Sequence, residues 1–231
     1  MIGFYNYTVF LTYLSLLSAS MGIFVSLNGQ GHPYVGVFFL LFCGLCDAFD
    51  GKVARMKKDR SETEQKFGIQ IDSLSDVVAF GVLPACIGVA MVRKSIYISN
   101  LRDMKSGAVI SVITSAMFMV FALYVLSAMI RLAYFNVTEE ERQQTEDGTL
   151  KYYTGVPVTT AALVFPAVLL IQYVTRLDLT LLYMVTEILM GFAFLSNFKI
   201  KKPGMKGVLV MVGIGVAEVL LLFLCKVLSR R

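Results

Sequence analysis

Seven apolar runs divide the chain, and polar or charged segments separate them. Each run is close to the roughly 20 residues that an α-helix needs to cross the hydrocarbon core of a bilayer. The runs occupy residues 7–27, 34–55, 67–92, 107–135, 156–174, 179–198 and 207–228. No internal repeat and no stretch typical of a soluble domain interrupts them, so we expect a single domain over residues 1–231. The pattern predicts an all-α integral membrane protein, a bundle of about seven transmembrane helices.

The polar segments between the runs predict the connections. Residues 57–66 are expected to form a charged connector, and residues 93–105 a polar loop. Residues 138–153 read as an acidic loop whose Glu-rich start could prolong the fourth helix. That fourth run is long enough for its end to project from the bilayer, which would carry Arg131 toward the level of the acidic residues discussed below.

Composition and charge support a membrane protein and suggest its orientation. The chain is 57% hydrophobic and 16% charged, whereas soluble domains average about 25% charged residues. If every apolar run crosses the membrane, segments 51–66, 131–151 and 199–206 lie on the same side. These segments carry thirteen of the 21 Lys and Arg residues, and the other eight lie elsewhere. The positive-inside rule makes that richer side cytoplasmic. Nucleic-acid binding is not expected, because Trp is absent and no basic stripe alternates with aromatic residues.

Four aspartates mark the ends of the second and third runs. Asp47 and Asp50 are three residues apart, and Asp72 and Asp76 are four apart, so each pair shares one face of its helix. An antiparallel hairpin would bring all four carboxylates to one depth, where a bare cluster would repel itself. Oxygen ligands suit Mg²⁺ or Mn²⁺. The four carboxylates therefore predict a paired-metal site for phosphoryl chemistry. The alternative is that the carboxylates are solvated helix ends, with Asp72 stabilising a helix N-terminus.

Small residues and one arginine accompany the aspartates. Gly51, Ala54 and Gly68 would let a backbone or a ligand approach closely. Arg55 follows Gly51 by one helical turn, and its guanidinium suits bidentate contact with a phosphate. These residues therefore predict a phosphate-containing ligand beside the metals.

The segment 47–55, together with Gly68, Asp72 and Asp76, resembles the signature of the CDP-alcohol phosphotransferase family. Twelve residues separate Arg55 from Gly68, a longer spacer than the family usually has, and we interpret the surplus as a longer turn. The resemblance implies metal ligands at Asp47, Asp50, Asp72 and Asp76, with Asp76 also the general base. It implies a CDP pocket lined by Gly51, Ala54, Arg55 and Gly68. It also implies a homodimer. The Lys/Arg count, by contrast, is what predicts an active-site cavity that faces the cytoplasm.

A second resemblance concerns the acceptor alcohol. Segments 131–136 (RLAYFN) and 153–157 (YTGVP) are similar to segments of the phosphatidylserine synthases, with Tyr134 and Val156 departing from the usual residues. This implies transfer of a phosphatidyl group from CDP-diacylglycerol to L-serine, giving phosphatidylserine and CMP, in the cytoplasmic membrane of a prokaryote. Arg131 would bind the serine carboxylate, with Asn136 nearby.

Other interpretations stay open at this point. The same chemistry could use glycerol phosphate, inositol phosphate or choline as the acceptor, and Arg131 could be an ordinary interfacial arginine. A cation transporter is a different class, but it predicts acidic groups near the bilayer midplane and inverted repeats. Glu187 and Glu218 fall within apolar runs, and such costly carboxylates suggest partners or a subunit contact that the sequence does not name.

Overall fold

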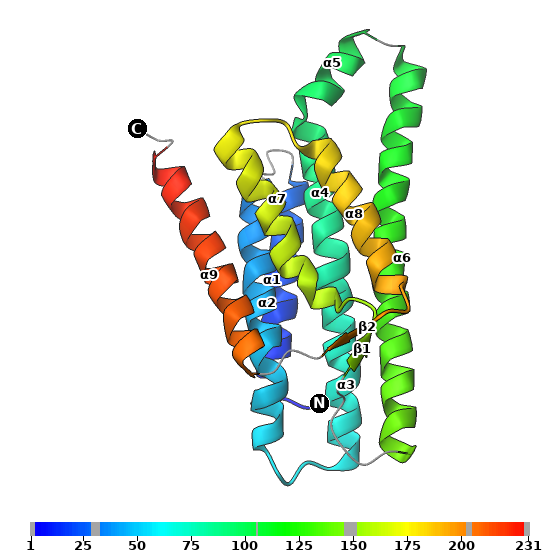
Figure 1. The fold of residues 1–231 in the computed structure, drawn as a ribbon, viewed down its shortest axis with the longest axis vertical. Helices are drawn as coiled ribbons and strands as arrows, with labels where there is room; N and C mark the ends of the chain where they lie inside the picture. Colours follow the sequence, from blue (N-terminus) through cyan, green and yellow to red (C-terminus); the bar gives the residue numbers. More distant parts are fainter. Residues whose placement is uncertain (1–2, 29–32, 105, 146–151, 202–204, 229–231) are drawn as a thin grey trace.

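A computed structural model describes residues 3–28, 33–104, 106–145, 152–201 and 205–228. Helices dominate this part of the chain, and one pair of short strands accompanies them (Figure 1). In chain order, the elements are α1 (Phe10–Leu27), α2 (Pro33–Met56), α3 (Glu62–Asp76), the π-helix η1 (Val77–Val82), α4 (Leu83–Lys94), α5 (Ile96–Met104), α6 (Gly107–Thr145), β1 (Tyr152–Thr154), the 3₁₀-helix η2 (Val158–Thr160), α7 (Ala161–Thr175), α8 (Thr180–Leu195), β2 (Lys199–Lys201) and α9 (Met205–Leu228).

Six helical spans in the described part of the chain are long and apolar enough to cross a membrane. One of them is continuous from Glu62 to Lys94 through α3, η1 and α4. The seventh expected run corresponds to α8, which is apolar but has only 16 residues. The predicted fold class is confirmed: the chain is an all-α membrane bundle.

The helices alternate in direction, so the connections fall at two ends (Figure 1). The α2–α3 turn, the end of α6 and the two strands gather at one end, which we call the acidic end because it also holds the aspartates. The loops after α4 and α7 and the end of α9 lie at the other. The three Lys/Arg-rich segments predicted to share one side therefore do so, although residues 146–151 and 202–204 of these segments lie outside the described residues.

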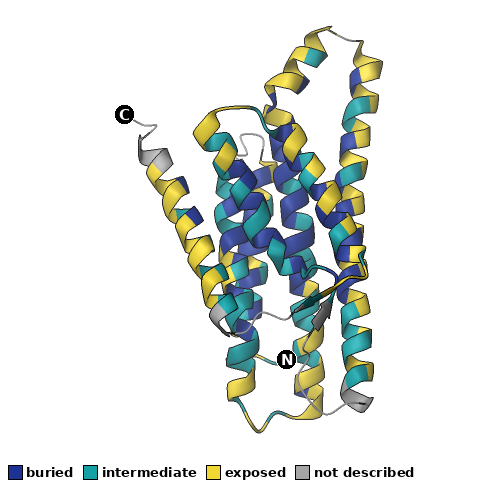
Figure 2. Cartoon of the chain, viewed as in Figure 1, coloured by how far each residue is buried: buried dark blue, intermediate teal, exposed yellow. Residues whose placement is uncertain are grey.

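Aromatic side chains fill the centre of the bundle, where buried residues concentrate (Figure 2). The Tyr124 ring meets Phe165 edge-on at 5.5 Å and Phe194 at 5.7 Å between centroids, and Phe165 also contacts Tyr183 at 4.9 Å. Such tilted pairs add to the burial of large apolar surfaces. These contacts pack α6, α7 and α8 against one another. By contrast, most of α9 and the outer face of α6 are exposed (Figure 2).

Three expected connections are more helical than the polar residues suggested. The connector expected over residues 57–66 is wrong in its second half, because α3 begins at Glu62. The polar loop expected over residues 93–105 contains α5. The Glu-rich start of the acidic loop prolongs α6 as far as Thr145, which is the alternative that the sequence had left open. Charged residues are compatible with helices that project beyond the apolar layer, so polarity marked the membrane boundary and not the helix end.

The two strands were not predicted from the sequence. β1 pairs antiparallel with β2, with Tyr153 opposite Ile200. Each strand has only three residues, too few for an alternating pattern to predict. Their pairing joins the segment before α7 to the segment before α9.

Candidate active site

The α2–α3 hairpin sets the geometry of the acidic end. The Ser61 side chain caps α3 by accepting a hydrogen bond from the backbone N–H of Glu64 at 3.2 Å. The residues Ser61 and Glu64 have the spacing of a capping box, a signal that could have placed the helix start correctly. Further along α3, Ser75 donates to the Thr12 carbonyl at 3.2 Å and ties the helix to α1.

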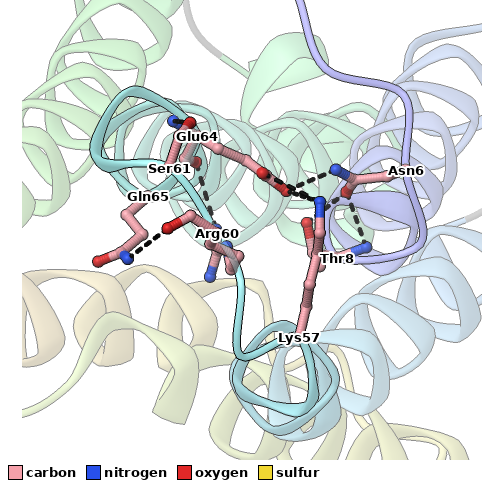
Figure 3. A network of polar contacts seen from close by, with 7 residues as sticks. All are labelled: Asn6, Thr8, Lys57, Arg60, Ser61, Glu64 and Gln65. Atoms are coloured by element: carbon pink, nitrogen blue, oxygen red, sulfur yellow. Dashed lines mark hydrogen bonds and ion pairs between the residues drawn. The ribbon is translucent and has the colours of Figure 1, made fainter.

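A buried carboxylate fastens the N-terminal segment to this hairpin (Figure 3). Glu64 is 5% exposed. It accepts hydrogen bonds from Lys57 Nζ at 2.9 and 3.0 Å and from Asn6 Nδ2 at 2.5 Å. Lys57 directly follows α2, and Glu64 lies in the first turn of α3. Their ion pair therefore holds the two helices in a fixed relative orientation.

The structure brings the four aspartates together between α2 and α3. Asp50 and Asp76 are each 8% exposed, and Asp47 and Asp72 are partly buried. The Asp50 and Asp72 carboxyl groups interact electrostatically. Asp76 interacts electrostatically with each of the other three. The aspartates of the two helices therefore lie within electrostatic reach of one another, while their role as metal ligands stays a prediction.

No described lysine or arginine forms an ion pair with any of these aspartates. Buried carboxylates without a countercharge and with oxygen donors only have the chemistry that Mg²⁺ and Mn²⁺ require. In the described residues, no three acidic, His or Cys side chains converge closely enough to hold an ion as placed. The residues therefore fit such an ion by donor type and charge.

The residues predicted to line a CDP pocket differ in their contacts and in their exposure. The Gly51 N–H donates to Asp50 Oδ1 at 2.5 Å. Arg55 is exposed, and its Nη1 would lie 3.4 Å from a Cβ added at Gly51, so the guanidinium lies over that glycine. Ala54 is half-buried on the same end of α2.

Gly68 has a neighbour that sequence reasoning missed. A Cβ at Gly68 would lie 2.6 Å from Arg60 Nη2, so the Arg60 guanidinium covers this glycine. Arg60 also donates to the Glu64 carbonyl at 3.3 Å, and its buried Nε has no partner in the described part of the chain. Arg60 belongs to the surplus residues of the α2–α3 spacer, which the motif alone gave no reason to single out.

The two residues predicted to bind the acceptor approach from α6. Asn136 Nδ2 donates to Ser73 Oγ at 2.7 Å, directly beside Asp72 in the chain. Arg131 is 6% exposed, and its Nε donates to the Val156 carbonyl at 3.3 Å. Its guanidinium also lies 5.5 Å from the centre of the Phe135 ring. The two sequence segments of the second resemblance thus meet through Arg131 and Val156.

Gly155 makes that meeting possible. Its φ of +72° is a left-handed conformation, and an added Cβ would lie 2.8 Å from the Ser196 carbonyl oxygen. Its N–H donates to the Phe198 carbonyl at 2.8 Å, and the Val156 N–H donates to the Ala193 carbonyl at 3.2 Å. Only glycine fits this turn without strain.

A cavity of about 790 Å³ opens between α2, α7 and α9. Its lining is mainly aliphatic and aromatic, and Asp47, Thr159 and Thr160 supply the polar groups. Val156 also lines it. The cavity thus joins one of the aspartates to a large apolar volume.

The two intramembrane glutamates lie apart from the aspartates along the chain. Glu187 on α8 is 0% exposed, and neither of its carboxyl oxygens has a partner in the described residues. Glu218 on α9 is 6% exposed, and its Oε2 likewise lacks one. The partners expected for these groups are not found within the described part of the chain.

Comparison with known proteins gives consistent matches. The family model described as CDP-alcohol phosphatidyltransferase matches residues 5–198. The CDP-diacylglycerol–serine O-phosphatidyltransferase of Saccharomyces cerevisiae is 32% identical over 162 residues, covering 66% of this chain and 50% of that protein. An archaetidylserine synthase of Methanothermobacter thermautotrophicus is 30% identical over 178 residues, covering 77% and 64%. A CDP-diacylglycerol–serine O-phosphatidyltransferase of Helicobacter pylori is 28% identical over 198 residues, covering 84% and 70%.

The matched region thus spans half of the yeast relative and under two thirds of the archaeal one. No solved structure matches the chain. The family match covers the aspartate hairpin, α6 and the Gly155 turn, which are the parts that build the site. The chain belongs to the CDP-alcohol phosphatidyltransferase family.

Proposed function

We propose that this protein transfers a phosphatidyl group from CDP-diacylglycerol to the hydroxyl of L-serine, giving phosphatidylserine and CMP. The observation that carries the proposal is the interaction of Asp76 with the other three aspartates, with Asn136 of α6 bonded to Ser73 next to Asp72. The names of two of the relatives describe the same reaction, and this supports serine as the acceptor.

The residues divide the work of this reaction. Asp47, Asp50, Asp72 and Asp76 would hold Mg²⁺ or Mn²⁺, which when bound neutralises the diphosphate and stabilises the departing CMP. Asp76 accepts the proton of the serine hydroxyl. The serine oxygen forms a bond to the phosphorus that carries the lipid, and the bond from that phosphorus to the bridging oxygen breaks. CMP leaves with the bonding electron pair.

The surroundings suit the two substrates. The apolar cavity beside Asp47 has room for hydrocarbon chains, so the lipid can lie there with its diphosphate at the aspartates. Gly51, Ala54, Arg55 and Gly68 would face the nucleotide, with the Arg55 guanidinium available to a phosphate. Arg131 is a buried cation placed to attract the serine carboxylate, and Asn136 would orient the amino acid next to Asp72.

The test follows CMP release by purified protein in detergent. CDP-diacylglycerol and Mg²⁺ or Mn²⁺ are supplied with serine, glycerol phosphate, inositol phosphate or choline. We expect CMP to depend on serine and on the metal. Release with a different alcohol would keep the chemistry and replace the acceptor, whereas no release with any alcohol would overturn the proposal.

A matched pair of asparagine variants tests the acceptor site. Asn136→Ala removes the amide beside Ser73 and is expected to raise the KM for serine by about tenfold. Asn197→Ala changes an exposed asparagine and is expected to leave that KM unchanged. Equal values for the two variants would remove Asn136 from the serine site.

We also propose that the acidic end faces the cytoplasm, as the Lys/Arg distribution supports. Asp59→Cys in the α2–α3 turn and Arg176→Cys in the α7–α8 loop place thiols at exposed positions at opposite ends. A membrane-impermeant thiol reagent should label Arg176→Cys in intact cells and Asp59→Cys in inverted vesicles. The opposite pattern would reverse the orientation. A homodimer remains a prediction from the family resemblance.

A further inference from the structure

A wide helical turn directly follows the last aspartate. The span from α3 to α4 passes through the π-helix η1, where the Leu83 N–H donates to the Val78 carbonyl, five residues earlier. A π-turn adds the equivalent of one residue to an α-helix and rotates everything before it by about 100° relative to everything after it. The direction in which Asp72 and Asp76 point is therefore set by η1.

A proline removes one backbone donor from this turn, and a tyrosine of α6 donates a hydrogen bond there. Pro84 has no N–H, so it cannot donate to the Phe80 carbonyl four residues earlier. Tyr124 of α6 donates its phenol to that carbonyl instead, with an oxygen–oxygen distance of 2.7 Å. Both Tyr124 and Phe80 are almost fully buried, at 2% and 0% exposure, so water has no access to replace this bond.

The Tyr124 hydroxyl is held firmly by its surroundings. Its ring packs between Phe165 of α7 and Phe194 of α8. One turn further along α6, Ala128 lies against Gly81 of η1, where an added Cβ would come within 3.3 Å of the alanine Cβ. The wide turn is therefore clamped against α6, the same helix that carries the predicted serine-binding residues.

A second buried tyrosine provides a built-in comparison. Tyr183 is 1% exposed and donates to the Pro84 carbonyl at 2.9 Å. That carbonyl lies in the first turn of α4, where the N–H four residues later also reaches it. Tyr183 thus adds a donor to a carbonyl that an α-helical N–H also reaches, whereas Tyr124 bonds a carbonyl whose α-helical donor is missing at Pro84.

We propose that Tyr124 is a positioning residue for the aspartate cluster. Its phenol holds the wide turn at Phe80 and so fixes the angle at which Asp72 and Asp76 face Asp47 and Asp50. Only the expected effect on turnover rests on the proposed function. The effect of Tyr124 on the four carboxylates can be tested by metal binding alone.

The experiment compares Tyr124→Phe with Tyr183→Phe in purified full-length protein. Mn²⁺ binding is followed by the paramagnetic resonance signal of the free ion, and CMP release is measured with CDP-diacylglycerol and serine. For Tyr124→Phe we expect the Mn²⁺ dissociation constant to rise and kcat to fall by about tenfold each, with the serine KM within about twofold of the original. Tyr183→Phe should match the unaltered protein in Mn²⁺ binding, although both variants lose a similar amount of thermal stability.

Pro84→Ala supplies the second variant, because an N–H at position 84, within α4, can donate to the Phe80 carbonyl in the α-helical register. In that background, Tyr124→Phe is expected to change the Mn²⁺ dissociation constant by less than about twofold. Equal Mn²⁺ binding by Tyr124→Phe and Tyr183→Phe would overturn the inference, as would an equal loss in both backgrounds. If the unaltered protein released no CMP, the proposed function would fail, while the Mn²⁺ measurements would still decide the role of Tyr124.

Discussion

Replacing Gly155 by alanine tests the turn between β1 and η2, which Arg131 of α6 contacts at Val156. Gly155 has a φ of +72°, and a Cβ there would lie 2.8 Å from the Ser196 carbonyl oxygen and 2.9 Å from the Phe194 carbonyl oxygen. Neither oxygen belongs to a flexible side chain, so the backbone must move. The turn then loses its present shape.

The cost can be worked from these contacts. A left-handed conformation costs an L-residue about 1–2 kcal/mol. Moving the backbone weakens the hydrogen bond from the Gly155 N–H to the Phe198 carbonyl, at about 1 kcal/mol. The backbone distortion that relieves the two carbonyl contacts costs at most about 1 kcal/mol more. The total of about 2–4 kcal/mol corresponds to a fall in Tm of roughly 4–16 °C for a chain of this size.

The assay combines thermal unfolding in detergent with the serine KM. The Val156 carbonyl moves with the turn, so Arg131 is displaced and we expect the serine KM to rise by about tenfold. Gly213→Ala is the control, because a Cβ there meets nothing within 4 Å and alanine favours the helix. The reasoning is refuted if Gly155→Ala and Gly213→Ala have the same Tm and the same serine KM.

Three further predictions concern single side chains. Asp76→Asn should lower kcat by roughly two to four orders of magnitude while substrate binding persists, and near-normal turnover would exclude Asp76 as the base. Arg60→Ala should raise the KM for CDP-diacylglycerol by about fivefold with little change in kcat, because the guanidinium has an unpartnered Nε at the predicted nucleotide pocket; an unchanged KM would place it outside. Burial raises the pKa of Asp178, but hydrogen bonds from Thr180, Ser95 and backbone N–H groups outweigh this and leave the pKa below its ordinary value. Its stabilising effect is thus complete above about pH 5 and is lost as the pH falls through about 4 and lower, so the Tm advantage over Asp178→Asn should shrink between about pH 5 and pH 3; a constant difference would contradict this.

The amino-acid sequence by itself determined the membrane bundle and the main feature of the site. The length of each apolar run fixed the spans, since a bilayer demands a minimum helical length. The three- and four-residue spacings of the aspartates fixed which carboxylates share a helix face, since helical periodicity is local. The turn between the two helices was short enough to make their meeting predictable. The start of α3 was also readable from Ser61 and Glu64, although polarity obscured it.

Only the tertiary structure decided how that site is supported. The contact of Arg131 with Val156 joins residues 25 apart, and the contacts of Tyr124 with Phe80 and of Asn136 with Ser73 join residues 44 and 63 apart. The wide turn of η1 and the pairing of β1 with β2 likewise had no signal in the apolar pattern. Local periodicity reports which face of a helix is apolar, but not which distant side chain meets it. Those pairings are selected by the packing of the whole bundle, which must give most buried polar groups a partner.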